Sequence, residues 1–180
     1  MYCNFTIMKK LHLILGIFMF AQFGNAQQND SYESLWEQVD KFEGEDLSKS
    51  ALELIETISK KAHLEKNKTQ IIKSLLYKSK FVLILEEDAE LNIVNDFKAE
   101  IGIAEGASKN ILHNYLANIY WQYFQQNRYR FYDRTSTETK VDQIDFKTWG
   151  LNTLFQEIDF HFQASLDNPE ALQKIPVSNY

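Results

Sequence analysis

Hydrophobic residues recur every three or four positions along most of the chain, which is the spacing of one face of an α-helix. The clearest case follows Ser108, where apolar and aromatic residues return in neighbouring pairs from Ile111 to Phe124. Polar and charged residues occupy the opposite face of each such segment, so each segment is expected to bury one side. The pattern predicts about six helices, over residues 31–43, 47–66, 69–86, 89–104, 108–127 and 148–166.

The connections between the first four predicted helices are short, so consecutive helices should form antiparallel hairpins. Hairpins of about 35–40 residues that repeat along a chain are typical of stacked arrays. We therefore predict an all-α fold in which antiparallel helical hairpins stack in a TPR-like, right-handed array. The repeat is irregular in sequence, and an irregular six-helix bundle is the alternative.

Polar segments divide and flank these helices. Residues 128–146 predict a loop inside a helical domain that spans residues 31–166, and residues 27–30 form a polar leader before it. Residues 167–180 begin with Asp-Asn-Pro, which ends the last helix. They are expected to form a C-terminal tail or an interrupted linker, with a short turn around residues 170–174.

The first 26 residues have the pattern of a cleavable secretory signal peptide. Lys9 and Lys10 precede an apolar run over residues 11–20, and small residues precede the expected cut before Gln27. About ten strongly apolar residues are too few to span a bilayer, which needs roughly 20. We therefore expect an exported protein, in the periplasm, the cell envelope or the extracellular space, with no stable membrane span after cleavage.

Composition narrows the classes of function. The lone cysteine, Cys3, lies in residues 1–7, which we expect to be an upstream extension because Met8 opens a typical signal sequence. Thiol catalysis, disulfides and lipid attachment are therefore not expected after cleavage. With 19 Lys and Arg against 25 Asp and Glu, the net charge is -6, which argues against a general nucleic-acid binder.

Catalytic and metal-binding patterns are absent from the sequence. It contains no G-x-S-x-G, P-loop, G-x-G-x-x-G or H-E-x-x-H motif. Glu157 and His161 lie four residues apart and could supply two metal ligands, but no further ligand is indicated, so we favour a helix-surface pair. The acidic run at residues 86–90 lacks the donor spacing of a calcium loop and is expected to be a solvated helix end. We expect a protein that is not an enzyme and has no cofactor and no metal.

The densest feature is YWQYFQQNRYRFYDR at residues 120–134. Aromatic residues interleaved with arginines can stack on single-stranded nucleic acid, but an acidic, exported domain argues against that use. We favour a structural role in which the helix end packs and the arginines pair with carboxylates or carbonyl groups. A protein-docking surface is the second interpretation. Its residues are Arg128, Tyr129, Arg130, Tyr132 and Arg134.

Three segments, residues 32–81, 116–135 and 141–158, resemble the N-terminal helical region of large exported bacterial alpha-2-macroglobulin-like proteins. The resemblance implies that macroglobulin β-sandwich domains follow such a region in a longer chain, and that the whole protein inhibits or traps proteases. This sequence stops at Tyr180 and has no Cys-x-Glu-Gln thioester motif, so protease trapping is carried over to none of its residues. We expect a truncated or fragmentary chain.

Two hypotheses of function follow. In the first, the chain is a non-catalytic interaction or spacer module of an exported protease-inhibitor-like protein, and its partner is another protein or the missing C-terminal domains. In the second, it is a stand-alone secreted TPR-like scaffold that binds a peptide or protein in a groove.

Overall fold

Every regular element of the described residues is a helix in the computed structural model, which describes residues 31–132, 142 and 144–176. This confirms the all-α prediction. The predicted signal peptide and polar leader lie outside the described residues. The elements are α2 (Tyr32–Gly44), α3 (Ser48–Leu64), α4 (Lys68–Leu85), α5 (Ala89–Ile103), α6 (Ala107–Tyr132), the 3-10 helix η2 (Phe146–Thr148), α7 (Leu151–Ser165) and α8 (Pro169–Leu172).

The chain divides into two compact units, residues 1–34 and residues 35–180. Of the first unit, only its last four residues are described. There the Ser31 hydroxyl accepts a hydrogen bond from the backbone N–H of Ser34 at 3.2 Å, which caps the start of α2. All that follows concerns the second unit.

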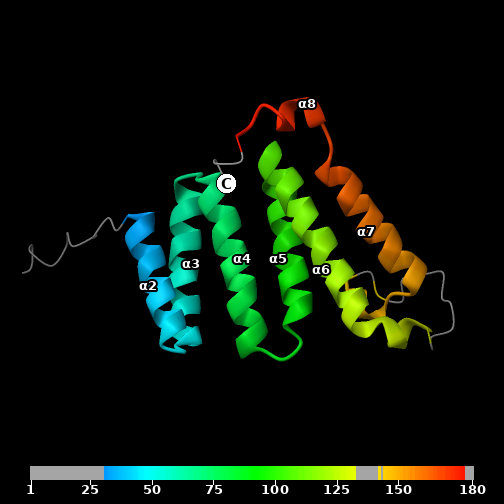
Figure 1. Ribbon diagram of the computed structural model, residues 1–180, viewed down its shortest axis with the longest axis horizontal. Helices are drawn as coiled ribbons and strands as arrows, with labels where there is room; N and C mark the ends of the chain where they lie inside the picture. The colour runs from blue at the N-terminus through cyan, green and yellow to red at the C-terminus, as the bar shows by residue number, and fades with distance from the viewer. Residues whose placement is uncertain (1–30, 133–141, 143, 177–180) are drawn as a thin grey trace, which may run out of the picture. The chain divides into compact units, whose positions relative to one another are not determined.

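Tight turns join the helices from α2 to α6. Residues with left-handed backbone conformation lie in these turns, and such residues reverse the chain within a few positions. Three of them are not glycine: Asp46 (φ 57°), Lys66 (φ 53°) and Asp88 (φ 61°). In Figure 1, α3 to α7 follow one another in chain order and alternate in direction. The antiparallel hairpins expected from the short connections are therefore present.

Helices also contact their next-but-one neighbours. The indole Nε1 of Trp36 in α2 donates to Gln70 Oε1 in α4 at 2.6 Å. His63 Nε2 at the end of α3 lies 3.0 Å from Glu100 Oε2 in α5. Helix α4 likewise packs against α6 as well as against α3 and α5. Contacts therefore join alternate helices as well as consecutive ones.

The largest buried side chains gather where α5, α6, α7 and η2 meet. Tyr120, Phe146 and Trp149 are fully buried there, with the Tyr120 ring 5.3 Å from that of Phe146 and 5.9 Å from that of Trp149. The Trp149 indole donates to the backbone carbonyl of Asp142 at 2.6 Å. Lys147 reaches Asp88 Oδ1 at 2.7 Å and Glu90 Oε2 at 3.1 Å, which ties η2 to the start of α5.

The structure corrects the predicted loop at residues 128–146 at both ends. Helix α6 continues to Tyr132 because Phe131 is buried and packs on Tyr123 and Phe124, at ring distances of 6.2 and 5.9 Å. At the other end Phe146 is fully buried, although it lies in a polar stretch. An isolated aromatic residue has no periodicity, so the pattern of the sequence did not reveal its place in the core.

No helix within the described ranges combines the length and the hydrophobicity needed to cross a bilayer.

Candidate functional site

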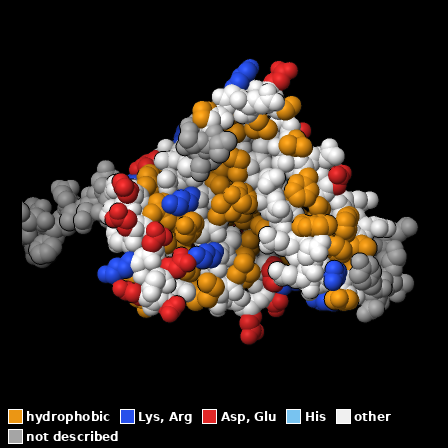
Figure 2. Space-filling model, viewed as in Figure 1, with side chains coloured by type: hydrophobic (Ala, Val, Ile, Leu, Met, Phe, Trp, Pro, Cys, Tyr) orange, Lys and Arg blue, Asp and Glu red, His pale blue; other side chains and the backbone are white. Residues whose placement is uncertain are grey.

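A groove of about 290 Å³ lies between α4, α5 and α6, and we call it the α4–α6 groove. Its apolar lining comes from all three helices and includes Leu76, Leu83, Phe97, Tyr115 and Ile119. Leu76 and Leu83 are seven residues apart, which is about two helical turns, so they lie on the same face of α4. Figure 2 shows hydrophobic side chains gathered on this face, over α4 and toward α6.

The groove exists because α4 is apolar on more than one side. Ile72, Phe81 and Val82 face the core and are buried. Leu83 is nevertheless 54% exposed, and Ile84 and Leu85 beside it are exposed as well. A helix that is apolar around most of its circumference has a second surface to cover, so this face is suited to contact with another molecule.

Two lysines of α4, Lys73 and Lys80, contact aromatic rings beside the groove, and Lys80 is one of its lining residues. Helix α4 carries four lysines and no acidic residue, although the chain as a whole is acidic. Lys73 Nζ lies 4.1 Å from the centroid of the Trp36 ring and 5.6 Å from that of Tyr77. Lys80 Nζ lies 5.7 Å from the Tyr77 ring and forms an ion pair with Glu43. The site thus joins an apolar floor to a cationic, aromatic edge.

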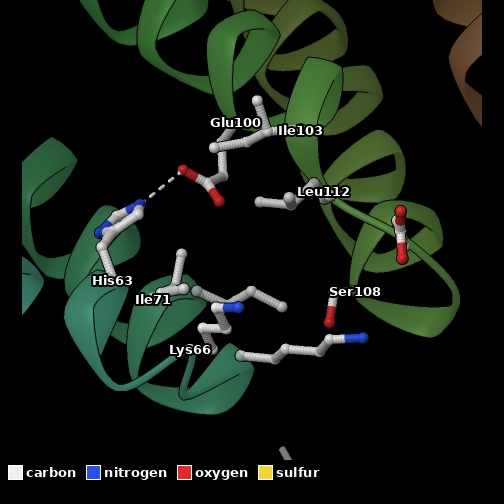
Figure 3. Close-up of a pocket in the computed structure, with 11 residues that line it drawn as sticks. His63, Lys66, Ile71, Glu100, Ile103, Ser108 and Leu112 are labelled. Carbon is white, nitrogen blue, oxygen red and sulfur yellow. Dashed lines mark hydrogen bonds and ion pairs between the residues drawn. The ribbon is translucent and has the colours of Figure 1, made fainter.

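A second hollow, of about 220 Å³, lies between the α3–α4 turn, the end of α5 and the start of α6. Figure 3 shows Ile71 and Leu112 on opposite sides of it, with the ion pair of His63 and Glu100 closing another side. Its rim carries both signs of charge, from Lys66 and Lys68 and from Glu100 and Glu105.

His63 is held from two sides at the rim of this hollow. Its Nδ1 lies 2.8 Å from the backbone carbonyl of Ser59, and its Nε2 faces the Glu100 carboxylate. Partial burial lowers the pKa of His63, but the Ser59 carbonyl and the Glu100 carboxylate stabilise the charged ring and raise its pKa overall.

Glu157 and His161 prove to be more than a surface pair. His161 Nε2 lies 3.8 Å from Glu157 Oε2, as their spacing predicts, but His161 is buried and its neighbour Phe160 is exposed. The helix-surface interpretation was therefore wrong for His161. Its ring contacts His113 of α6, a residue that sequence reasoning did not connect with it. In the described part of the chain, no cluster of three or more His, Cys, Asp or Glu side chains could hold a metal ion.

The predicted docking residues lie at the end of α6. Arg128, Tyr129 and Arg130 are exposed, and the Arg128 guanidinium lies 5.2 Å from the Tyr129 ring centroid. Arg130 Nη1 donates to Asn127 Oδ1 at 3.4 Å. Arg134 and the side chain of Tyr132 lie outside the described residues. The interactions seen here join neighbours on one helix, so they do not supply the arginine–carboxylate pairs of the favoured structural role, and the docking surface stays a prediction.

Comparison of the chain with protein-family models, with curated proteins and with solved structures found no match.

Proposed function

We propose that the chain is a non-catalytic helical interaction module, and that its α4–α6 groove binds an apolar segment of a partner polypeptide that also carries carboxylates. The single observation that carries this proposal is the exposed apolar lining of the groove on α4, exemplified by Leu83. Contiguous exposed apolar surface is the usual mark of an interaction site in a folded domain.

The chemistry of the partner follows from the edge of the groove. Lys73 is held over Trp36 and beside Tyr77, so its ammonium group is positioned without an acidic residue in that contact. A carboxylate on the partner would meet this positive charge while apolar side chains occupy the floor. Electrostatic complementarity of this kind governs the specificity and rate of association more than the affinity.

The arrangement of the helices supports a TPR-like stack as the architecture of the module. The contacts of Trp36 with α4, of His63 with α5 and of α4 with α6 join alternate helices, as in arrays of stacked hairpins. Such arrays use one layer of helices to form an extended binding surface. In such a stack α4 and α6 would share one layer, and residues of both helices line the groove.

The setting of the module rests on the sequence alone. The signal-like N-terminus supports export to the periplasm or cell envelope, and the resemblance to alpha-2-macroglobulin-like proteins supports a place at the front of an envelope protein. In that setting the partner segment belongs either to a separate protein or to domains that follow this one. Nucleic acid is not proposed as a partner, because the chain is acidic.

The experiment is selection of peptides from a displayed random library by the full chain, followed by measurement of their Kd. Selected peptides should be enriched in apolar residues together with Asp or Glu. Leu83→Glu should weaken their binding by tenfold or more, because it places a charge on the groove floor, and Lys73→Glu should weaken it by about fivefold.

Leu166→Glu is the matched control, since Leu166 is 70% exposed and lies after α7, away from the groove residues. It should leave the Kd unchanged. Peptides without acidic enrichment, or peptides that bind the Leu83→Glu variant as tightly as the wild type, would overturn the proposal.

A further inference from the structure

Two buried histidines join α6 to α7. The Nδ1 atoms of His113 and His161 lie 2.7 Å apart, and the two residues are only 6% and 5% exposed. At this distance one Nδ1 donates its hydrogen and the other accepts it. The contact therefore requires that at least one ring be neutral, because two fully protonated rings would both be donors.

Charged groups from several elements face the pair. On α7, Glu157 lies 3.8 Å from His161 Nε2. Lys98 of α5 and Lys109 of α6 act on the pair as positive charges, and Asp167, just beyond α7, acts on His113 as a negative charge. The positive groups oppose a charge on the rings and the two carboxylates favour it.

Burial is nevertheless the largest influence on both rings. The pKa of His161 is lowered to about 4, mainly by burial; His113 and Lys98 also lower this pKa, and Glu157 partly offsets the change. The pKa of His113 is lowered by burial and by Lys109, and Asp167 opposes this change. The hydroxyl of Tyr120, whose ring centroid is 6.0 Å from that of His161, is also buried and has no hydrogen-bond partner among the described residues. The surroundings thus offer little solvation to an added proton.

The pair lies within the α6–α7 contact, about one turn from the C-terminal end of α7. Beyond it, the Asn110 amide donates to the backbone carbonyls of Ala164, Ser165 and Asp167 at 3.2, 3.2 and 2.9 Å, which satisfies the C-terminal end of α7. On the other side, the Phe155 ring packs on Phe124 at 4.9 Å. The buried hydrogen bond between His113 and His161 depends on the protonation state of the two imidazole rings.

We propose that the His113–His161 contact is an acid-sensitive clasp that holds α7 on α6 at neutral pH and loosens it as the pH falls. In the unfolded or opened chain the rings take up protons near the usual pKa of about 6.5, whereas in the closed hairpin they resist protonation. Stability from the clasp is therefore fully present above about pH 6.5. It is lost progressively as the pH falls toward 4, where His161 itself titrates.

The experiment is hydrogen exchange of the full chain, followed by mass spectrometry at pH 7.5 and pH 5.0 with correction for intrinsic exchange rates. If one ring titrates, the population of molecules in which α7 is open should rise about tenfold for each pH unit below 6.5. The corrected exchange rate of α3 should show no comparable change. His113→Gln keeps a donor and an acceptor but does not titrate, so it should reduce this pH dependence. His63→Gln is the matched control and should keep it.

A titration of the imidazole nitrogens by NMR tests the clasp in the unaltered chain, in case a variant does not fold. His161 should stay neutral to below pH 5. Equal protection of α7 at both pH values after correction, or titration of His161 near pH 6.5, would overturn the proposal.

Discussion

His63 and His161 each join one helix to another through a ring nitrogen, but in opposite surroundings. His63 lies at an open rim, with its side chain 41% exposed and facing the Glu100 carboxylate. His161 lies inside the α6–α7 contact and faces another imidazole. The pKa of His63 is raised by its hydrogen-bond partners, and that of His161 is lowered by burial. The same residue type thus stabilises one contact in acid and the other near neutral pH.

The difference shows that the partner and the access of water decide how a histidine responds to pH. A carboxylate partner near solvent stabilises the protonated imidazole and raises its pKa. A neutral partner in an interface without water does not stabilise the added charge, so the pKa of the imidazole falls. Sequence neighbours do not decide the response, because both rings have a residue four positions earlier within reach, Ser59 for His63 and Glu157 for His161.

The largest expected effect comes from a permanent charge at each position. His161→Lys should lower the free energy of unfolding by about 3 kcal/mol or more, because it places a permanent positive charge inside the interface, away from water. His63→Lys should change it by no more than about 0.5 kcal/mol, since the new ammonium still meets Glu100 near solvent. Urea unfolding at pH 7.5 measures both, and similar losses for the two variants would contradict the comparison.

A smaller effect is expected from removal of the charge on Glu100. Because the pKa of His63 is raised in the folded chain, its pairing stabilises the fold below about pH 6.5 and is lost as the pH rises through the folded pKa. Glu100→Gln should therefore lower the free energy of unfolding by about 0.5 kcal/mol at pH 5.5 and by less at pH 8. The His113→Gln variant should show the opposite trend relative to wild type, and urea unfolding across this pH range compares the two. A Glu100→Gln loss that grows with pH would contradict this assignment.

The smallest effect is that of salt. The ion pair between His63 and Glu100 is partly solvated, so about 0.5 M NaCl at pH 5.5 should reduce the difference between wild type and Glu100→Gln by about half. At pH 7.5 the His113–His161 contact is neutral and buried, so the effect of His113→Gln should not change with salt. Unfolding curves at two salt concentrations suffice for this test. Equal salt dependence of the two variants would show that the contacts do not differ in charge.

Local patterns in the sequence predict much of this fold. Helix α3 spans Ser48–Leu64 against the prediction of residues 47–66, because an uninterrupted apolar stripe and a turn after it define its limits. The end of α6 was misplaced, since Phe131 lies among arginines and tyrosines and only tertiary contact reveals its burial. The burial of Phe146 could not be predicted from the sequence for the same reason.

The candidate sites were harder to predict because they depend on register between helices. His113 and His161 are 48 residues apart, and nothing in either segment predicts that the two rings meet. The sequence does contain a signal for the groove, in apolar residues that lie on more than one side of α4. Spacing alone does not say which of these residues face another helix, and Leu83, Ile84 and Leu85 are exposed.

The sequence around the exposed end of α4 also bears on contacts between copies of the chain. Three consecutive apolar residues, Leu83 to Leu85, are followed at once by the exposed acidic residues Glu86, Glu87 and Asp88. Charges that flank an apolar stretch act as gatekeepers, because two molecules that approach through this stretch also bring their like charges together. The acidic run, which has no calcium-loop pattern, is therefore expected to oppose contact between copies of the chain through this end of α4.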